Sequence, residues 1–359
     1  MKKFAWFLTL LLALSIVLSA CGAPAATQAP APVATEAPAQ PTEAPAATEA
    51  PAATEAPAAE PFKVAVVMPS AKNDLAFSQS MYDALLRVQE EMGSDQFQFV
   101  FSENMFVVDD AAAAIRDYAS QGYNLIIAHG SQYGSSLQEI APDFPETSFA
   151  WGTTVDTFGQ PNIFAYEAAS QEGGFVNGVM AATLSKSNVI GVVGPIETGD
   201  AKLYVDGFKA GVLSVKPDAK VNVNYIGSFS DTALAAEAAN THISAGADVL
   251  TGTAQMVVGA IGKAKDSNVL WFGTQSNQTS LAPEIVVASQ VYHWEGILKE
   301  MISLIQSGTL GGKSFKADLA NGGEVIEFNP DSKVAADAKT LAETTIKGIT
   351  DGTVKITLP

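Results

Sequence analysis

From residue 63 onward, short β-branched runs alternate with longer amphipathic segments, and this alternation restricts the fold more than any other feature of the chain. The first run, Lys63 to Met68, has the character of a strand that is buried on both faces of a parallel sheet. The segment that follows predicts an amphipathic helix over 75–92. Regular strand–helix–strand order with short connections predicts parallel sheets with right-handed crossovers, and therefore an α/β fold.

The alternation falls into two series of similar length, which predicts two doubly wound parallel-sheet lobes joined by a hinge. The first series has strands at 63–68, 97–101, 125–128 and 148–151, and helices at 75–92, 109–121 and 133–141. After a helix at 171–185, the second series has strands at 189–193, 221–225, 248–250 and 269–272, and helices at 200–214, 231–245 and 256–265. We assign 62–168 to lobe 1, together with part of 289–330, and 169–288 to lobe 2. The segment 331–359 is expected to hold a C-terminal helix that the sequence assigns to neither lobe.

The N-terminus resembles a bacterial lipoprotein signal. Lys2 and Lys3 precede an apolar run over 4–17, which is shorter than the ~20 residues that a spanning helix needs. Small residues then lead to Cys21, the only cysteine of the chain. The resemblance implies that a signal peptide of residues 1–20 is removed and that Cys21 carries the lipid, for instance palmitate, which anchors the protein to the membrane.

Residues 21–61 follow as a linker built almost entirely of Ala, Pro, Thr, Glu and Gln. Thr-Glu-Ala-Pro recurs at 35–38, 42–45, 48–51 and 54–57. Such a run has little bulky apolar surface to bury, and its prolines exclude continuous helix. At ~3 Å per residue, an extended linker of ~40 residues holds a domain on the order of 100 Å from its anchor.

Charge and missing motifs limit the classes of function. The chain has 20 Lys+Arg and 38 Asp+Glu, a formal charge of −18, and loss of Lys2 and Lys3 makes it about −20. That balance disfavours nucleic acids and anionic lipid surfaces as partners. Three scattered histidines without metal-ligand spacing predict no metal site. The glycine-rich phosphate loops and the Gly-x-Ser-x-Gly elbow are missing, so we predict no enzyme and no cofactor.

The candidate binding residues lie in the loops after the strands, because ligands of doubly wound sheets sit at the carboxyl ends of the strands. These loops carry neutral hydrogen-bonding groups with occasional aromatic residues, which suits a small, flat, neutral ligand. The predicted ligand-binding residues are Asn73, Asp74, Phe77, Ser78, Gln79, His129, Ser131, Trp151, Phe229, Gln255, Thr274, Gln275 and Asn277.

Several of these residues have a second interpretation that the sequence leaves open. Asp74 either caps the first helix or contacts the ligand, and Trp151 belongs either to the core or to the cleft. Asp231 is expected to cap the helix that follows it. Phe77 and Phe229 come from loops of opposite lobes, so closure of the lobes is predicted to bring their rings to the two faces of one heterocycle.

The segment Asp74-x-x-Phe77-Ser78-Gln79 resembles the Asp-Lys-Ser-Phe-Asn motif of the basic membrane protein (Bmp/Med-like) lipoproteins. Further stretches agree with that family in order over essentially all of 62–330, at 172–175, 207–211, 227–231 and 246–250. The resemblance implies a type I periplasmic-binding-protein fold and the role of substrate-binding protein of an ABC importer. It also implies ABC permease subunits as partners, an extracytoplasmic location on the membrane, and a purine base or nucleoside as ligand. We expect a monomer.

The chain departs from the family at two positions that matter for the ligand. Thr274 stands where the nucleoside binders usually carry an acid that binds ribose hydroxyls, and the lysine of the following strand is missing from 288–294. These two departures therefore favour a free purine base over a nucleoside as the ligand. A flavin or neutral sugar in the same fold, and a ligand-sensing receptor in place of a transporter subunit, remain the alternatives.

Overall fold

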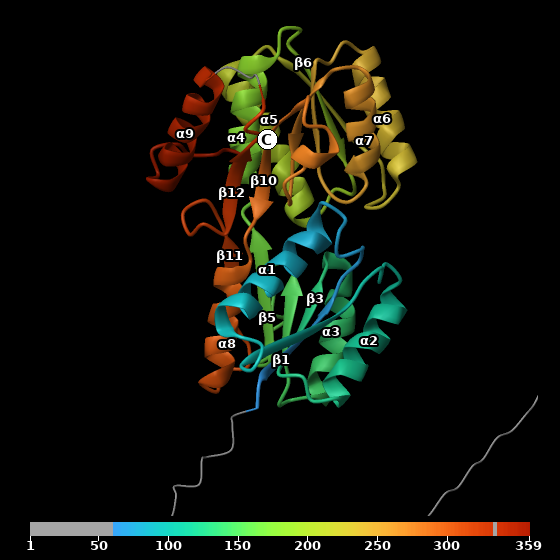
Figure 1. Cartoon of the computed structure of the whole chain (residues 1–359), viewed down its shortest axis with the longest axis vertical. Coiled ribbons are helices and arrows are strands. Elements are labelled where there is room, and N and C mark those ends of the chain that lie inside the picture. The colour runs from blue at the N-terminus through green and yellow to red at the C-terminus, as the bar shows by residue number, and fades with distance from the viewer. Residues whose placement is uncertain (1–59, 333–335) are drawn as a thin grey trace, which may run out of the picture. The chain divides into compact units, whose positions relative to one another are not determined.

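The structure is a computed structural model that describes residues 60–332 and 336–359 (Figure 1). The predicted signal peptide, Cys21 and most of the linker lie outside the described residues. Within the described part of the chain, none of the helices combines the length and the apolar character that crossing a membrane requires. The described residues form two sheets, each covered by helices that follow the alternation seen in the sequence.

The first sheet has six strands in the order β11-β5-β4-β3-β1-β2, and all neighbouring strands run parallel. Its strands are β1 (Phe62–Val67), β2 (Phe97–Ser102), β3 (Leu125–His129), β4 (Ser148–Gly152), β5 (Ile163–Ala168) and β11 (Ser314–Ala317). The helices beside it are α1 (Phe77–Met92), α2 (Val108–Ser120), α3 (Gly134–Ile140) and α8 (Glu295–Gln306), with short 3₁₀ turns at Ser131–Tyr133 and Ala141–Asp143.

The second sheet also has six strands, in the order β12-β10-β9-β8-β6-β7. Its strands are β6 (Val189–Gly194), β7 (Lys220–Tyr225), β8 (Val249–Gly252), β9 (Leu270–Gly273), β10 (Val286–Tyr292) and β12 (Glu324–Phe328). Its helices are α4 (Gln171–Leu184), α5 (Gly199–Val215), α6 (Thr232–Ser244), α7 (Val257–Asp266) and α9 (Ala336–Thr350), with a 3₁₀ turn at Thr279–Leu281.

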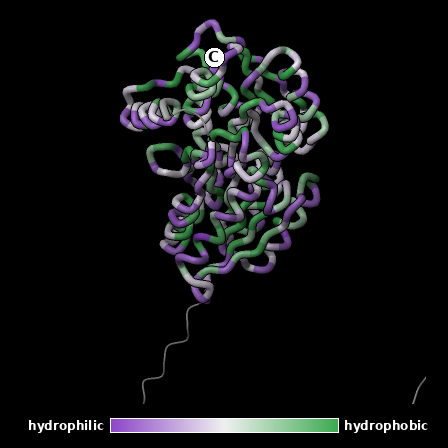
Figure 2. The backbone as a smooth tube through the Cα atoms, turned by 45° about the horizontal axis from the view of Figure 1, so that its top comes forward, coloured by the Kyte–Doolittle hydropathy of each residue, from purple (hydrophilic) through white to green (hydrophobic). Residues whose placement is uncertain are grey.

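Both sheets place their first strand between the second and the third, which confirms the doubly wound α/β fold. In such an order the connections diverge to opposite faces next to the first strand, and a crevice forms at the carboxyl ends of the strands. The loops after the strands of each sheet therefore lie at this edge. Figure 2 shows how apolar and hydrophilic stretches alternate along the chain that builds these layers.

The chain passes between the two sheets through three crossing segments, at 168–171, 292–295 and 317–324. The last of them delivers β12 to the edge of the second sheet antiparallel to β10, whereas the sequence predicted parallel sheets. The physical reason is that β12 returns directly from the first sheet without a crossover helix, so it runs opposite to its neighbour. The strand β5 was not predicted from the sequence either.

The C-terminal helix α9, which the sequence left unassigned, packs beside α4 against the second sheet (Figure 1). Ala342 belongs to the same apolar cluster as Val176 and Met180 of α4, and Ile346 and Ile349 pack against that cluster. Helix α4 is thus covered on several sides, which explains why most of its residues are apolar or small and buried.

Candidate functional site

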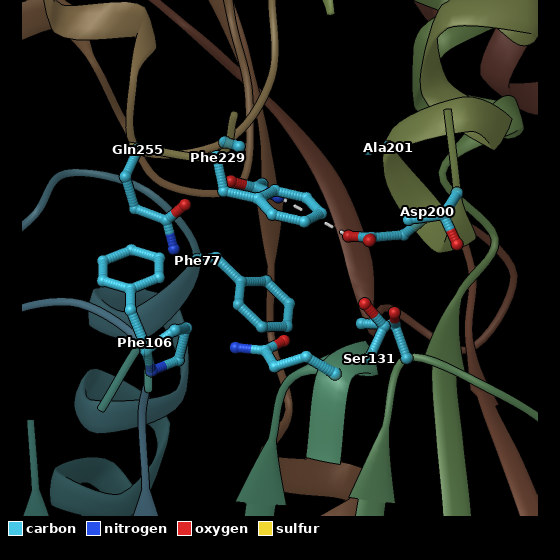
Figure 3. Close-up of a pocket in the computed structure, with 13 residues that line it drawn as sticks. Phe77, Phe106, Ser131, Asp200, Ala201, Phe229 and Gln255 are labelled. Atoms are coloured by element: carbon cyan, nitrogen blue, oxygen red, sulfur yellow. Dashed lines mark hydrogen bonds between the residues drawn. The ribbon is translucent and has the colours of Figure 1, made fainter. Parts of the chain in front are cut away.

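A cavity of ≈ 30 Å³ lies between the carboxyl ends of the two sets of strands. Loops of the first sheet contribute one side and loops of the second sheet the other, as expected for this topology. Five predicted residues line it, namely Phe77, Ser131, Phe229, Gln255 and Gln275 (Figure 3). The sequence reasoning missed Pro69, Phe106, Gln132, Thr153, Thr198, Asp200, Ala201 and Ala254.

Phe77 forms a supported wall on the first-lobe side of the cavity. It is the first residue of α1 and its exposed fraction is 7 %. Its ring stacks on that of His129, with the ring centres 3.7 Å apart and the planes 6° from parallel. His129 therefore lies beneath Phe77, in the wall, and is not among the residues that line the cavity.

The hydrogen bonds of His129 hold this wall in place. Its Nε2 is 3.0 Å from the carbonyl oxygen of Phe77, and its Nδ1 is 2.7 Å from the hydroxyl of Tyr166. Because a carbonyl only accepts, Nε2 carries the hydrogen and Nδ1 accepts from Tyr166. Burial lowers the pKa of His129 from 6.5 to about 3, so the imidazole is neutral at ordinary pH.

The loop before Phe77 is held by Asp74. Its carboxylate accepts hydrogen bonds from the backbone N–H groups of Ala76, Ser78 and Gln79 at 2.9–3.2 Å. This is the capping interaction that the sequence allowed as one of two interpretations, because these donors have no partner within the first turn of α1. Burial is the largest influence on Asp74 and raises its pKa.

The neighbours of Asp74 also bond within the loop. Ser78 Oγ accepts from the backbone N–H of Ser70 at 3.1 Å, and Gln79 Oε1 accepts from that of Leu75 at 2.9 Å. Asn73 is exposed. Of the predicted residues in this segment, the structure therefore brings only Phe77 to the cavity.

Phe229 faces the cavity from the second lobe, on the loop between β7 and α6. Its ring is half-buried, and its carbonyl oxygen accepts a hydrogen bond of 3.0 Å from the N–H of Met256. Asp231 ends the same loop and accepts from the N–H of Leu234 at 2.9 Å, so its predicted role as a helix cap is confirmed. Figure 3 shows Phe77 and Phe229 with their rings near one another across the cavity.

Asp200 is the only ionisable residue among those that line the cavity. It lies in the first turn of α5, and its exposed fraction is 7 %. Its Oδ2 accepts from the Tyr292 hydroxyl at 3.0 Å and from Gln275 Nε2 at 3.5 Å. Burial raises the pKa of Asp200 from 3.8 to about 6.

The sequence carries a signal for Asp200, which stands directly after a loop that follows a predicted strand. The predicted helix over 200–214 includes Asp200, so this residue is not among those of the loop after the strand at 189–193. Its first-turn position directs the side chain toward the same edge as the loop. Residues in the first turn of the helix after such a loop therefore also belong to the candidate positions for a site at this edge.

Two buried amide oxygens in the cavity wall have no hydrogen-bond partner within the described chain. They are Oε1 of Gln255 and Oε1 of Gln275. An unpaired buried acceptor costs free energy unless a ligand or water satisfies it. Together with the Asp200 carboxylate, these oxygens make the lining of the cavity rich in hydrogen-bond acceptors.

Other predicted residues bond to their own chain outside the cavity. Trp151 donates from Nε1 to the Gly130 carbonyl at 3.1 Å and stacks on Phe158. Thr274 is fully buried, and its hydroxyl donates to the Gly252 carbonyl at 3.0 Å. Asn277 donates to Glu327 at 2.6 Å. Among residues 60–332 and 336–359, no cluster of three or more His, Cys, Asp or Glu side chains is arranged to hold a metal ion.

The sequence of the chain is similar to those of a known protein family and of several known proteins. Residues 62–354 match the family model described as ABC transporter substrate-binding protein PnrA-like (Bmp). A purine-binding protein of Brucella abortus is 28 % identical over 293 residues, which cover 82 % of each chain. The ABC transporter nucleoside-binding protein BmpA of Lactococcus lactis is 27 % identical over 320 residues, covering 83 % of this chain and 89 % of BmpA. The transcriptional activator protein Med of Bacillus subtilis is 27 % identical, covering 74 % and 81 %.

Solved structures share the fold. An ABC transporter solute-binding protein from Aeropyrum pernix superposes with a TM-score of 0.70 at 19 % identity, covering 83 % of this chain and 94 % of the other. A counterpart from Conexibacter woesei gives a TM-score of 0.68 at 20 % identity, covering 83 % and 99 %. These similarities establish the two-lobed architecture of periplasmic-binding-protein-like solute-binding proteins.

Proposed function

The chain belongs to the PnrA-like (Bmp) family of ABC transporter substrate-binding proteins, and from this premise we propose that it captures a purine base or nucleoside between its lobes for import. The observation that carries the proposal is the pair of phenylalanine rings, Phe77 and Phe229, that line one cavity from opposite lobes. Stacking on a flat heterocycle contributes ~0.5–1.5 kcal/mol per aromatic residue beyond buried area. The relatives named for purine and nucleoside binding support this ligand class.

The free base is favoured over the nucleoside. Thr274, which takes the place of the family's ribose-binding acid, is fully buried and bonded to Gly252. Its hydroxyl is therefore not directed at a sugar.

Binding requires the lobes to separate and close again. A volume of ≈ 30 Å³ has room for about two water molecules, less than a purine occupies. The three crossing segments supply the hinge, as in other binding proteins that close around a ligand. Small-angle scattering with and without saturating adenine or guanine should show a difference in radius of gyration, and identical curves would count against closure.

The ligand class is tested by native mass spectrometry of protein purified from its own host, followed by calorimetry with purine bases, nucleosides, flavins and sugars. We expect a purine base or nucleoside to bind more tightly than the other classes. Tight binding of a sugar alone would overturn the proposal. A flavin in place of a purine would keep the stacking walls but change the substrate.

We further propose that Cys21 carries the lipid that holds the protein on the extracytoplasmic face of the membrane. Stable attachment takes two acyl chains or more, which a lipoprotein N-terminus provides. The Cys21→Ala protein should appear in the soluble fraction after cell disruption, while the native protein stays with the membranes. A variant that still fractionates wholly with membranes would contradict the anchor.

The partner distinguishes transport from sensing. We expect the ligand-loaded protein to associate with the permease subunits of an ABC transporter and to function as a monomer. The similarity to Med, whose name describes a transcriptional activator, keeps the sensing role as the second candidate. Deletion of the gene should abolish uptake of the radiolabelled ligand; unchanged uptake with a changed transcriptional response would favour sensing.

A further inference from the structure

We propose that Asp200 determines the specificity of the cavity by binding an adjacent pair of N–H or O–H donors on the ligand. This inference rests on the proposed function and adds to it the part of the ligand that is recognised. The donor pair has two chemical sources. One is the edge of an aminopurine, where a ring N–H lies next to an amino group, and the other is the vicinal diol of a ribose.

The position of Asp200 is the first support. Its side chain lies beside the two phenylalanine rings, on the opposite side of the cavity from Phe106 and Gln255 (Figure 3). A heterocycle stacked between Phe77 and Phe229 would turn one of its edges toward this carboxylate. The two rings would contact the two faces of such a flat ligand, and the carboxylate would bind donors on its edge.

The charge of Asp200 is not balanced by a cation in the cavity. The residues that line the cavity include no lysine, arginine or histidine. Lys202, two residues along α5, forms its ion pairs with Glu197 and Asp206, at 3.1 and 2.8 Å. The partners of Asp200 are neutral donors, Tyr292 and Gln275. A buried carboxylate of this kind gains stabilisation from further donors and opposes an anionic ligand.

The neighbouring acceptors strengthen the same preference. Gln275 turns its amide N–H₂ toward Asp200, which directs Oε1 away as a buried acceptor with no partner in the part of the chain that the structure describes. Gln255 Oε1, on the opposite side of the cavity, is a second buried acceptor that has no partner among the described residues. A ligand that brings several donors satisfies these atoms, whereas a ligand that lacks them leaves the atoms unpaired, which is a strong basis for discrimination.

Tyr292 positions the carboxylate. Its hydroxyl donates to Asp200 and is also 2.6 Å from Ser170 Oγ. Ser170 and Tyr292 lie at the first and second crossing segments, so the orientation of Asp200 is set where the chain passes between the lobes. The carboxylate is therefore oriented before the ligand arrives, which preserves its selectivity.

Calorimetry on the native protein with two matched pairs of compounds tests the inference. Guanine offers a ring N–H next to an amino group, and hypoxanthine lacks the amino group. Inosine offers a vicinal diol, and 2′,3′-dideoxyinosine lacks it. We expect the donor-bearing member of one pair to bind at least tenfold more tightly than its partner, and the pair that discriminates identifies the source.

The same titrations on Asp200→Asn should reduce that difference to about twofold or less. Glu197→Gln is the matched control, because it removes a carboxylate from the loop just before α5, outside the cavity, and should leave all four affinities unchanged. Asp200→Glu keeps the charge but moves the carboxylate, so it should also lose the discrimination. This variant replaces Asp200→Asn as the test if Asp200→Asn does not fold.

Each outcome separates the inference from the proposed function. Native protein that binds purines but does not distinguish either pair overturns the role of Asp200 alone. Discrimination that persists in a folded Asp200→Asn protein does the same. Native protein that binds none of the four compounds overturns the proposed function, and the inference with it.

Discussion

The two sides of the cavity are built differently. On the first-lobe side, Phe77 begins a helix and is stacked on a buried, hydrogen-bonded His129. On the second-lobe side, Phe229 belongs to a loop, is half-buried, and lies in the same wall as the buried acid Asp200. One side therefore presents a buried aromatic ring, and the other a half-buried ring together with the polar groups to which we assign recognition of the ligand. In the proposed function, the aromatic platform contributes mainly to affinity, and the polar groups of the other side contribute selectivity among ligands.

The largest expected effect is that of Phe77→Ala. Removing a buried ring from the platform should lower the free energy of unfolding by about 3 kcal/mol or more. Ligand affinity should fall by a factor of about ten, equal to roughly 1.4 kcal/mol. Chemical denaturation and calorimetry measure the two quantities. A large loss of affinity without loss of stability would mean that Phe77 is not part of a structural platform.

The next effect is a dependence of stability on pH that comes from His129. Its pKa is about 3 when folded and 6.5 when exposed, so the unfolded chain binds the extra proton between these values. Stability therefore falls as pH drops from 6.5 toward 3, by roughly 1 kcal/mol per pH unit. Denaturant titrations of the native protein and His129→Phe should differ in this slope.

Phe229→Ala should affect binding but hardly stability. Loss of one stacking ring should lower the affinity for the ligand by up to about tenfold. The free energy of unfolding should change by less than about 1 kcal/mol, because the ring is half-buried on a loop. Unchanged affinity in both Phe77→Ala and Phe229→Ala would refute the sandwich. Equal losses of stability in the two variants would remove the contrast between the walls.

The smallest effect concerns pH and Asp200. Its pKa of about 6 means that the carboxylate is mostly ionised at pH 7 and mostly protonated at pH 5.5. A ligand that donates to the ionised form should bind about fourfold more weakly at pH 5.5 than at pH 7. Calorimetry at the two pH values measures this change. The effect should vanish in Asp200→Asn, and an affinity that rises on acidification would show that the ligand prefers the protonated acid.

Much of the fold can be predicted from the sequence, because buried strands and helices require apolar residues at regular positions along the chain. The runs at 63–68 and 189–193 are apolar because both faces of a central parallel strand are covered, and the structure places β1 and β6 there. The strands β5 and β12 left weaker signals. The direction of β12 depends on a crossing segment that joins the two sheets, which no local pattern encodes.

The site was predicted in part for the same reason. Topology alone predicts that loops after strands meet at one edge, and Phe77, Phe229 and Gln255 of these loops line the cavity there. Only the tertiary structure decided which side chains face it. His129 turns beneath Phe77, and Asp200 enters from the first turn of a helix, because contacts distant in the chain set their directions.

The sequence by itself determined the two alternating series, the loops that meet at the ligand edge and the aromatic residues within them, since each depends on local composition and order. The tertiary structure alone decided that one acid, Asp200, is buried against Tyr292 and Gln275 in the wall of the cavity. Burial of a charge depends on what surrounds it in three dimensions. Tyr292 lies 92 residues further along the chain, a separation that no local pattern spans.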